Sequence, residues 1–540
     1  MSEPSVFRSS AIMAAGTILS RITGLARNLL LVAALGTAII GDTYQVANTV
    51  PTIVYILVAG GALNAVFVPQ IVREMKSDDG GHSYTSQLAT ATFTILGSAT
   101  LIGILAAPLL VHLYATKFGG SGLESEFDLT VLFTRYCLPQ VLFLGLFTLF
   151  GQIANARGSF GPMMWAPILN NLVVIGVLIG FIAVAPDAKS GVITSGAKAL
   201  LGIGTSLGAF VQAAILIPVI KRTGLHIRPN FHWSSLGKSA HLAKWTLVFV
   251  AINQIGFMVI VNLATAASVR AKEAGLSTGV GFTPYQNAHF IFLLPHSIIA
   301  VSLVTALLPR ISRLAAETKI TQVRDDIQNT MLNLYALIIP AAFSLLFLGE
   351  PVAYFIFTGS SLDDARQIGL ILSGFALGLI PFCGSYLLLR GFYAFEDTKT
   401  PAGITLLMNI VMITSAIISY AILPIRWITV GIAVSFGIGY LASSLWARHL
   451  LRKRIGEIRF GKTLWLISLA SLVAFAPSLL FSREIPRIMS NGAPNFATSF
   501  LTLTLSGALA VFIYFLVGNR LKISPIVVLK NTLQSKLARR

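Results

Sequence analysis

Charged residues are scarce in this chain of 540 residues. They make up 11% of it, and acidic residues are the scarcer kind, with 20 Asp and Glu against 39 Lys and Arg. So little charge, together with 55% hydrophobic residues and a mean hydropathy of +0.80, excludes an ordinary soluble domain. The two cysteines, Cys137 and Cys383, have no redox or metal-ligand spacing, and we expect both to pack as small apolar side chains.

Motifs of nucleotide, metal and hydrolytic sites are also missing from the sequence. No glycine-rich loop is followed by Lys and Ser or Thr, and spacing singles out no metal-ligand cluster and no Ser/His/Asp set. The sequence therefore predicts a protein that is not an enzyme and that has no cofactor. A cleavable signal peptide is not convincing, because the first apolar stretch resumes after Arg27, so we expect an uncleaved first span.

Long apolar runs are what the chain has instead. Runs of about 18 to 25 residues recur along its length, and each is long enough to cross a bilayer as a helix. The sequence predicts an all-α integral membrane protein with about 14 transmembrane helices. The expected spans are roughly 10–36, 43–72, 87–115, 128–155, 161–185, 196–220, 244–268, 283–309, 327–349, 367–395, 401–423, 427–448, 463–482 and 497–518.

The basic residues that give the net charge of +19 lie mostly in loops between apolar runs, and this placement does not indicate a nucleic-acid-binding surface. About 26 of the 39 basic residues fall in alternate loops and in the two termini, and the other loops hold about nine. Because cytoplasmic loops of membrane proteins carry the excess of Lys and Arg, we expect both termini to be cytoplasmic.

Two segments of the chain repeat at nearly the same offset. Residues 63–73 match residues 303–313, and residues 151–170 have counterparts in residues 391–409. This offset predicts two six-helix lobes related by a pseudo-twofold axis, with the substrate between them. The expected parts are an N-lobe (1–222), a cytoplasmic linker (223–243), a C-lobe (244–450), two extra helices (451–520) and a basic cytoplasmic tail (521–540).

Arg21 and Arg27 interrupt the first apolar stretch. An arginine at bilayer depth costs at least about 2.5 kcal/mol, so it normally faces a wet cavity or an opposite charge. The two are six residues apart, about 120° around an unbroken helix, and we expect a break at Gly24 to bring both to one cavity. The planar guanidinium suits phosphate. The alternative is that both arginines reach the headgroup layer.

Asp42, Gln45, Thr49 and Thr52 form a polar stripe at helical spacing in the second span. Asp42 either pairs with one of the two arginines, which limits the cost of a buried charge, or lies in a loop outside the membrane. Pro51 permits a bend that a moving gate could use, or else it forms a static kink. We expect the arginines and this stripe to bind an anionic substrate.

The eighth span carries two histidines on one face. Tyr285, His289, Phe292 and His296 follow helical spacing, so both imidazoles share one environment. They could bind substrate or a proton, or they could be ordinary hydrogen-bonded histidines between helices.

The first two spans resemble the N-terminal signature of the MurJ (MviN-type) lipid II flippases of the multidrug/oligosaccharidyl-lipid/polysaccharide exporter superfamily. Further motifs in the second lobe are similar, and the resemblance covers nearly the whole chain. The residues that carry it are Ser20-Arg21-x-x-Gly24-x-Ala26-Arg27, Asp42, Pro51, Gly61-Ala62-x-x-x-x-Phe67-Val68-Pro69, Leu307-Leu308-Pro309-x-Ile311-Ser312 and Gly391-Phe392-Tyr393 with Asp397-x-Lys399-Thr400-Pro401.

The resemblance implies a transporter of peptidoglycan biosynthesis in the bacterial cytoplasmic membrane. It would move undecaprenyl-diphosphate-linked precursor (lipid II) from the inner to the outer leaflet by alternating access, and so serve cell-wall biogenesis and cell shape. Arg21, Arg27 and Asp42 match cavity positions, Ser20 belongs to the same motif, and the last two spans would hold the lipid tail. The partners implied are lipid II, membrane lipids and cell-wall synthesis proteins, for a monomer. The driving force would be the membrane potential or an ion gradient, and no sodium site is evident.

The chain departs from the family pattern where many relatives have further charges. Tyr55-Ile56, Gly60 and Phe290 stand at these places, and His289 and His296 are candidates to replace the missing positive charge. Three alternatives stay open: a flippase for another undecaprenyl-linked glycan, a drug exporter of the same superfamily, and a membrane scaffold for cell-wall enzymes. A drug exporter would need carboxylates in the pocket, whereas here arginines lie in the spans.

Overall fold

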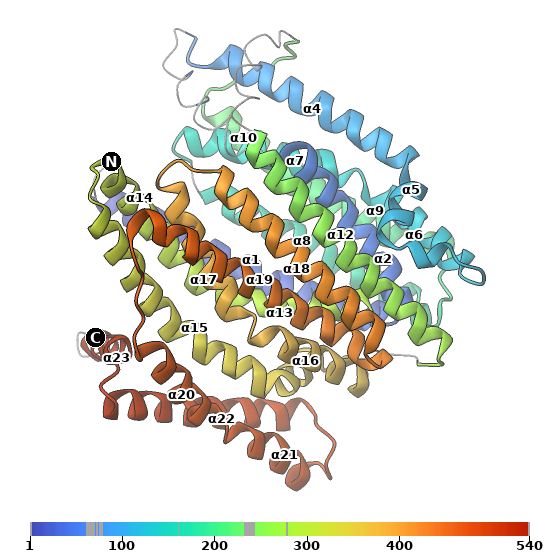
Figure 1. Ribbon diagram of the computed structural model, residues 1–540. Helices are drawn as coiled ribbons and strands as arrows, with labels where there is room; N and C mark the ends of the chain where they lie inside the picture. Colours follow the sequence, from blue (N-terminus) through green and yellow to red (C-terminus); the bar gives the residue numbers. More distant parts are fainter. Residues whose placement is uncertain are drawn as a thin grey trace. The chain divides into compact units, whose positions relative to one another are not determined.

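The chain is built from helices. The computed structural model describes residues 3–60, 71, 74, 79–159, 161–231, 244–276 and 279–537, and every regular element in these ranges is a helix (Figure 1). The predicted all-α fold is therefore confirmed for the described residues. Long helices follow from the composition, because a helix satisfies its backbone hydrogen bonds internally where hydrocarbon offers none.

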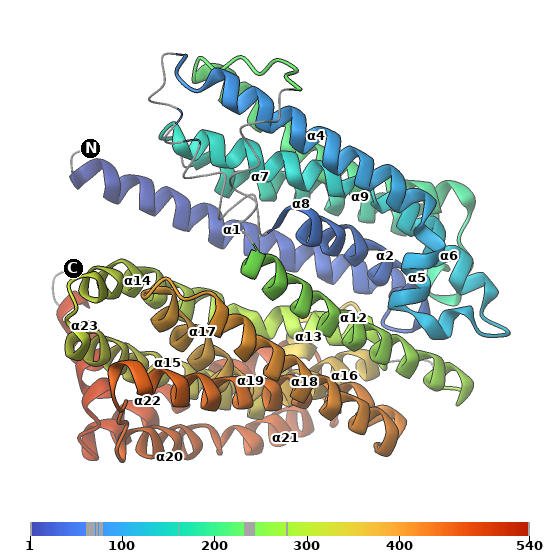
Figure 2. The same cartoon turned by 45° about the horizontal axis from the view of Figure 1, so that its top comes forward.

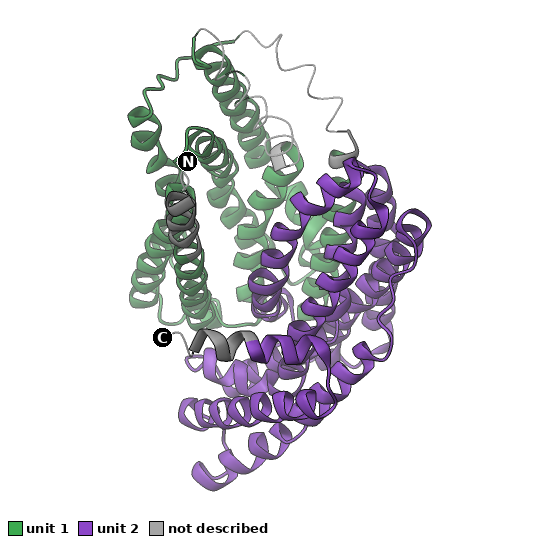
Figure 3. Cartoon of the chain, turned by 90° about the vertical axis from the view of Figure 1, so that its left-hand side faces the viewer, with its two compact units in different colours: residues 1–269 green, residues 270–540 purple. Residues whose placement is uncertain are grey.

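The chain divides into two compact units, residues 1–269 and 270–540 (Figure 3). The division falls inside α12 (Lys244–Glu273), and the lobe boundaries expected from the sequence stay predictions. The described helices of unit 1 that precede α12 are α1 (Glu3–Leu35), α2 (Ile39–Tyr55), η1 (Ile56–Gly60), α4 (His82–Leu105), α5 (Ala107–Tyr114), η3 (Thr116–Gly119), α6 (Glu124–Cys137), α7 (Gln140–Ala156), α8 (Gly161–Val184), η4 (Ala188–Ser190), α9 (Ser195–Ala214) and α10 (Leu216–Arg222).

Unit 2 continues with helices of the same kind. Its described helices are α13 (Phe282–Pro295), η5 (His296–Ala300), α14 (Val301–Ala316), α15 (Ile320–Ile356), α16 (Leu362–Ala376), α17 (Leu379–Tyr393), α18 (Lys399–Ile422), α19 (Ile425–Ile455), α20 (Thr463–Phe475), α21 (Ser478–Met489), α22 (Phe496–Arg520) and α23 (Ser524–Leu537).

Membrane-spanning helices account for most of the chain. Twelve helical stretches among the described residues are long and apolar enough to cross a bilayer, and α16 with α17, bent by 47°, makes a thirteenth. Each coincides with one expected span. The remaining one, 43–72, contains residues 61–70, which lie outside the described part, so the count of fourteen is not confirmed. The protein is a multi-pass membrane protein.

Two π-helical turns fall at matching places in the two units. The first, η1, follows α2 at Ile56–Gly60, and the second, η5, follows α13 at His296–Ala300. Their separation of 240 residues equals the offset of the sequence repeat. A π turn is rare and marks a local change of helix direction, often at a functional site. The repeat predicted from the sequence thus has a matching local conformation in both units.

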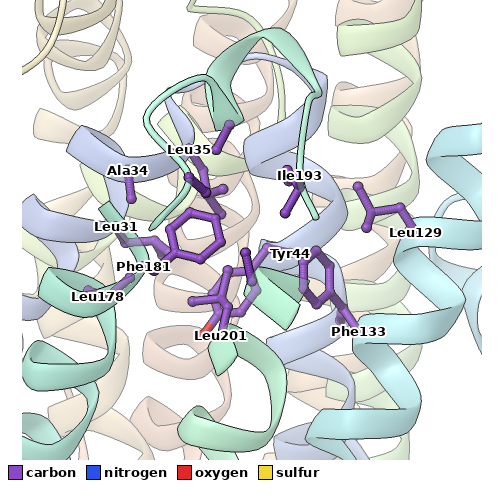
Figure 4. Packing of buried hydrophobic residues seen from close by; sticks show 14 of the residues in the cluster. Leu31, Ala34, Leu35, Tyr44, Leu129, Phe133, Leu178, Phe181, Ile193 and Leu201 are labelled. Carbon is purple, nitrogen blue, oxygen red and sulfur yellow. The ribbon is translucent and has the colours of Figure 1, made fainter. Parts of the chain in front are cut away.

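The core of unit 1 joins the end of α1 to the start of α2. Gly36, at φ +72°, ends α1 in the left-handed conformation, and α2 begins three residues later. Tyr44 packs edge-on against Phe133 of α6, with ring centroids 5.6 Å apart, and its hydroxyl lies 2.6 Å from the Thr205 hydroxyl of α9 (Figure 4). Phe181 and Leu178 of α8 join the same cluster. This core holds α2 against α6, α8 and α9.

Small residues let helices approach closely in unit 2. A Cβ atom added at Gly437 of α19 would lie 2.9 Å from Cα of Gly378, at the start of α17. Both neighbouring atoms are backbone, so no side chain can move to make room. Beside this contact the Ser385 and Ser443 hydroxyls lie 2.6 Å apart. Close backbone approach with hydroxyl bonds across the interface is how helices associate in lipid, where burial of apolar surface contributes little.

Gly437→Ala is expected to lower the thermal unfolding midpoint of the purified full-length protein by several degrees, because overpacking costs about 1–3 kcal/mol. Gly403→Ala is the matched control, since no atom lies within 4 Å of an added Cβ on this exposed face of α18. The control should leave the midpoint unchanged or raise it slightly. Equal midpoints for the two variants would contradict the close contact of α17 with α19.

Candidate functional site

Arg21 and Arg27 lie on different faces of α1. The helix continues through Gly24 without interruption, so the expected break is absent, and a separation of about 120° follows from helix geometry. Arg21 is exposed and lies among the exposed side chains of Ile18 and Ile22. Arg27 is half-buried, and its guanidinium interacts electrostatically with the Tyr44 hydroxyl. Within unit 1, Arg27 is therefore the arginine that faces α2.

Ser20 lies on the face of α1 that packs against α8. Asn171 of α8 donates its amide N–H to the Ser20 carbonyl oxygen at 3.1 Å and to the Thr23 hydroxyl at 3.0 Å. One turn earlier, Gly16 lies against Trp165, and a Cβ atom there would approach the indole Nε1 to 2.8 Å. The structure places the backbone of Ser20 in a helix–helix contact, and its expected role in binding substrate stays a prediction.

Asp42 is fully buried in the first turn of α2, with 0% of its surface exposed. The alternative of an ordinary loop residue is therefore wrong. A carboxylate in this place is stabilised by the positive end of the helix dipole, which lowers the cost of burial. The expected pairing of Asp42 with Arg21 or Arg27 stays a prediction.

The polar stripe continues along α2. Gln45 is buried, and its carbonyl oxygen accepts a 2.7 Å hydrogen bond from the Thr49 hydroxyl. On the same helix, Asn48 accepts a 3.3 Å bond from the Gln140 amide of α7. Pro51 is buried inside α2 and is followed five residues later by η1. The sequence singled out this helix, but spacing along one helix could not identify Gln140 as the partner of Asn48.

His289 and His296 lie inside a group of aromatic side chains in unit 2. The ring centroid of His289 is 5.3 Å from that of Phe375 in α16 and 5.6 Å from that of Phe436 in α19. His296 is 8% exposed, with its ring 4.2 Å from Phe382, and its Nδ1 lies 3.4 Å from Sγ of Cys383 in α17. Their shared helix face was predictable, but the aromatic residues around them come from helices about 80 to 150 residues away in sequence and were missed.

Asp397 ties a turn of unit 2 to the end of α19. Its carboxylate accepts bonds from the Thr400 backbone N–H at 2.9 Å and the Thr400 hydroxyl at 2.7 Å, and Arg454 donates to it at 2.5 Å. In unit 1 the corresponding turn after α7 is held differently, because Arg157 donates to the carbonyl oxygen of Gly80 at 2.6 Å. Both turns are thus fixed by an arginine, which the spacing of the repeat did not reveal.

A model of one protein family covers most of the chain. The family described as "Lipid II flippase MurJ" matches residues 31–519. The chain belongs to the MurJ lipid II flippase family. The family predicted from the sequence is thus confirmed.

Relatives in the MurJ family are similar over most of both chains. "Lipid II flippase MurJ" of Burkholderia cenocepacia is 28% identical over 463 residues, which cover 83% of this chain and 84% of the relative. "Probable lipid II flippase MurJ" of Rhizobium tropici is 26% identical over 93% of this chain and 92% of its own length.

Solved structures share the fold. One described as "Lipid II flippase MurJ, inward closed conformation" covers 95% of this chain and 99% of its own with a TM-score of 0.73 at 18% identity. A multidrug resistance transporter of the MATE family, described in an inward-facing conformation, covers 82% and 98% with a TM-score of 0.62 at 14% identity. The chain therefore shares its fold with both of these transporters.

The Asp397 turn predicts a pH-dependent stability difference. Burial alone would raise the pKa of Asp397, but the bonds from Thr400 and the charge of Arg454 outweigh it and lower the pKa below its ordinary value. The carboxylate therefore stabilises the fold above the unfolded-state pKa of about 3.9, and this is lost as the pH falls through the folded-state pKa. Asp397→Asn should lower the thermal midpoint at pH 7, and this difference from the wild type should shrink as the pH falls below about 3.9.

Asp187→Asn is the control for this measurement, because Asp187 is exposed in a loop between α8 and η4. Its thermal midpoint should follow that of the wild type at every pH. A gap between Asp397→Asn and the wild type that stays constant from pH 8 to pH 3 would disprove the stabilising role of the ionised carboxylate.

Proposed function

We propose that this protein is a transporter that flips lipid-linked peptidoglycan precursor, lipid II, from the inner to the outer leaflet of the bacterial cytoplasmic membrane. The match of the family model to residues 31–519 carries this proposal. The half-buried Arg27 and the fully buried Asp42 support it, because charge at bilayer depth is retained where it serves a substrate or ion. A transporter of this kind is not an enzyme and needs no cofactor.

The proposed substrate site is a cationic cavity that binds the diphosphate. Arg21 and Arg27 neutralise the phosphate oxygens, since each guanidinium can donate two parallel hydrogen bonds and stays charged at every physiological pH. Asp42 holds an arginine in place while the cavity is empty, and Gln45 and Thr49 supply uncharged hydrogen bonds beside it. Pro51 and the π turn that follows α2 are the places where the second span changes shape.

Alternating access moves the headgroup while the lipid tail stays in hydrocarbon along the last two spans. With both termini cytoplasmic, as the loop charges predict, the headgroup leaves the negative side of the membrane. Each unit of charge gains about 2.3 kcal/mol per 100 mV, so a headgroup of charge −2 gains about 4–5 kcal/mol. The membrane potential is thus a sufficient driving force without a sodium site, and the protein acts as a monomer.

Three rival functions differ in what they require of the arginines. A flippase for another undecaprenyl-linked glycan would use the same cationic cavity, so only the transported lipid distinguishes it. A scaffold for cell-wall enzymes would have no use for charge inside its first span. A drug exporter for cations would be impaired by these arginines, because like charges repel the cargo.

Replacement of Arg27 by Ala is expected to abolish function, because the diphosphate then loses its inward-facing guanidinium. In a strain depleted of its native flippase, Arg27→Ala should fail to support growth, and lipid II should accumulate on the inner leaflet. Arg21→Ala should behave in the same way. Arg27→Lys keeps the positive charge but lacks the planar guanidinium with its paired donors, so it should support growth only in part.

Arg135→Ala is the matched control, because this arginine also lies in a span, on the exposed face of α6. It should support growth, with lipid II reaching the outer leaflet. If Arg21→Ala and Arg27→Ala also support full growth at equal expression, the cationic cavity is wrong and the scaffold gains support.

His289 and His296 are proposed as the second-lobe part of the substrate site. His289→Phe keeps a ring of similar shape among Phe375 and Phe436, so the thermal midpoint should change little, whereas transport should fall because the imidazole N–H is lost. His289→Ala should reduce both. Full growth with His289→Phe and with His296→Phe would leave the two histidines a packing role only.

A further inference from the structure

The segment that follows α10 runs back along α4 in unit 1. Its backbone N–H groups at Arg228 and Asn230 donate to the Ser86 hydroxyl at 3.2 Å and the Thr90 hydroxyl at 2.9 Å. Leu225 is 1% exposed and packs in the core beside Leu88. Alternate residues of the segment, among them Arg228, are exposed instead. The segment is therefore fastened to α4 with its basic side chains directed outward.

Two cavities lie on either side of this segment. The first cavity has a volume of about 670 Å³ and a mostly apolar wall. Phe93 of α4, Phe150 of α7 and Ile217 of α10 contribute to this wall. Lys221 and Arg228 line its edge. The second cavity, of about 730 Å³, has a mixed wall of polar and apolar groups, and His82 and Arg228 line it. Arg228 thus borders a mainly apolar cavity and a mixed one. Figure 2 shows α4 beside α7, the two helices between which the apolar wall forms.

The described residues that line the two cavities carry only positive charge. Lys221, His226 and Arg228 are exposed, and no described acidic side chain is part of either wall. A carboxylate next to the second cavity, that of Asp79, accepts hydrogen bonds from the backbone N–H groups of Gly81 and Ser83. Lys221 and Arg228 form no ion pair with another described residue of unit 1, and two such cations beside an apolar wall attract an anion that carries hydrocarbon.

The position of the cavities matches the edge of a bilayer. Lys221 lies in the last turn of a candidate span that ends at Arg222, and His82 begins another. Phe93 and Ile217, at 57% and 43% exposed, lie within the same two spans and face outward. In water such exposure would be unfavourable, whereas next to acyl chains it costs nothing. Basic side chains at span ends lie at headgroup depth.

We propose that this pair of cavities binds one acidic phospholipid, with its phosphate between Lys221 and Arg228 and an acyl chain against Phe93, Phe150 and Ile217. A nucleotide or a soluble phosphate would leave the apolar wall uncovered, and a zwitterionic lipid would bring a second cation toward Arg228. The site contains none of the residues proposed to bind transported substrate, so its lipid binding can be tested independently of the proposed flippase function. A bound lipid would fasten the segment that leads from α10 toward α12.

The test uses the full-length protein, stripped of lipid in detergent and titrated with phosphatidylglycerol or phosphatidylcholine, with the bound fraction read by native mass spectrometry. Wild type should prefer phosphatidylglycerol. Lys221→Gln/Arg228→Gln should weaken the tightest phosphatidylglycerol site by about tenfold or more, because each basic residue near a lipid surface contributes close to one decade of affinity. Binding of phosphatidylcholine should not change.

Lys117→Gln/Lys189→Gln is the control, because it removes the same charge from exposed positions in the short helices η3 and η4 of unit 1. It should change phosphatidylglycerol affinity less than twofold. Phe93→Gln should weaken both lipids alike. The proposal is overturned if the two double variants have equal affinity, or if millimolar glycerol 3-phosphate displaces the lipid and so identifies a soluble-phosphate site.

Discussion

A polar atom inside hydrocarbon has no water to bond and needs a partner within the protein, and this constraint shapes most of the structure. Hydroxyl groups in the spans turn back to their own helix, as Thr205 does to the Leu201 carbonyl and Ser435 to that of Gly431, both in the i to i−4 pattern. Others join helices, as Tyr514 of α22 does by donating to the Ala336 carbonyl of α15 at 2.6 Å. The fully buried carboxylate of Asp42 and the half-buried guanidinium of Arg27 differ from these hydroxyl groups because they are ionisable groups inside the spans, which is why the proposed substrate site is built on them.

Apolar packing fixes the position of Asp42 at the corner between α1 and α2. Gly36 turns the chain, Tyr44 fixes the first turns of α2 against α6 and α9, and Asp42 is thereby held at the positive end of a helix. The apolar cluster around Tyr44 thus holds α2, and with it the polar stripe of that helix, in place. In the other unit, α13 carries His289 and leads into η5 as α2 leads into η1, so the two π turns follow helices that carry candidate site residues in both units.

The sequence predicted what hydropathy and spacing can measure. Thirteen expected spans coincide with described helices, the family followed from the motif around Arg21 and Arg27, and the offset of the repeat reappears in the two π turns. Contacts between distant helices could not be predicted, because they depend on tertiary packing that no local pattern encodes. Examples are the rings of Phe375 and Phe436 around His289, the bond from Arg454 to Asp397, and the bond from Gln140 to Asn48. The expected break at Gly24 is absent because a single glycine inside a long apolar helix costs only about 1 kcal/mol, which packing of α1 on α8 outweighs.

The central claim is that an anionic headgroup crosses the membrane through a cationic chamber, driven by the potential. The most direct measurement is the rate at which lipid II appears in the opposite leaflet of vesicles that contain the purified protein, while a potassium diffusion potential is varied. The account predicts that the rate rises as the loading side is made more negative and falls when the potential is reversed. Transport that does not respond to the sign of the potential, or no transport of lipid II at any potential, would contradict it.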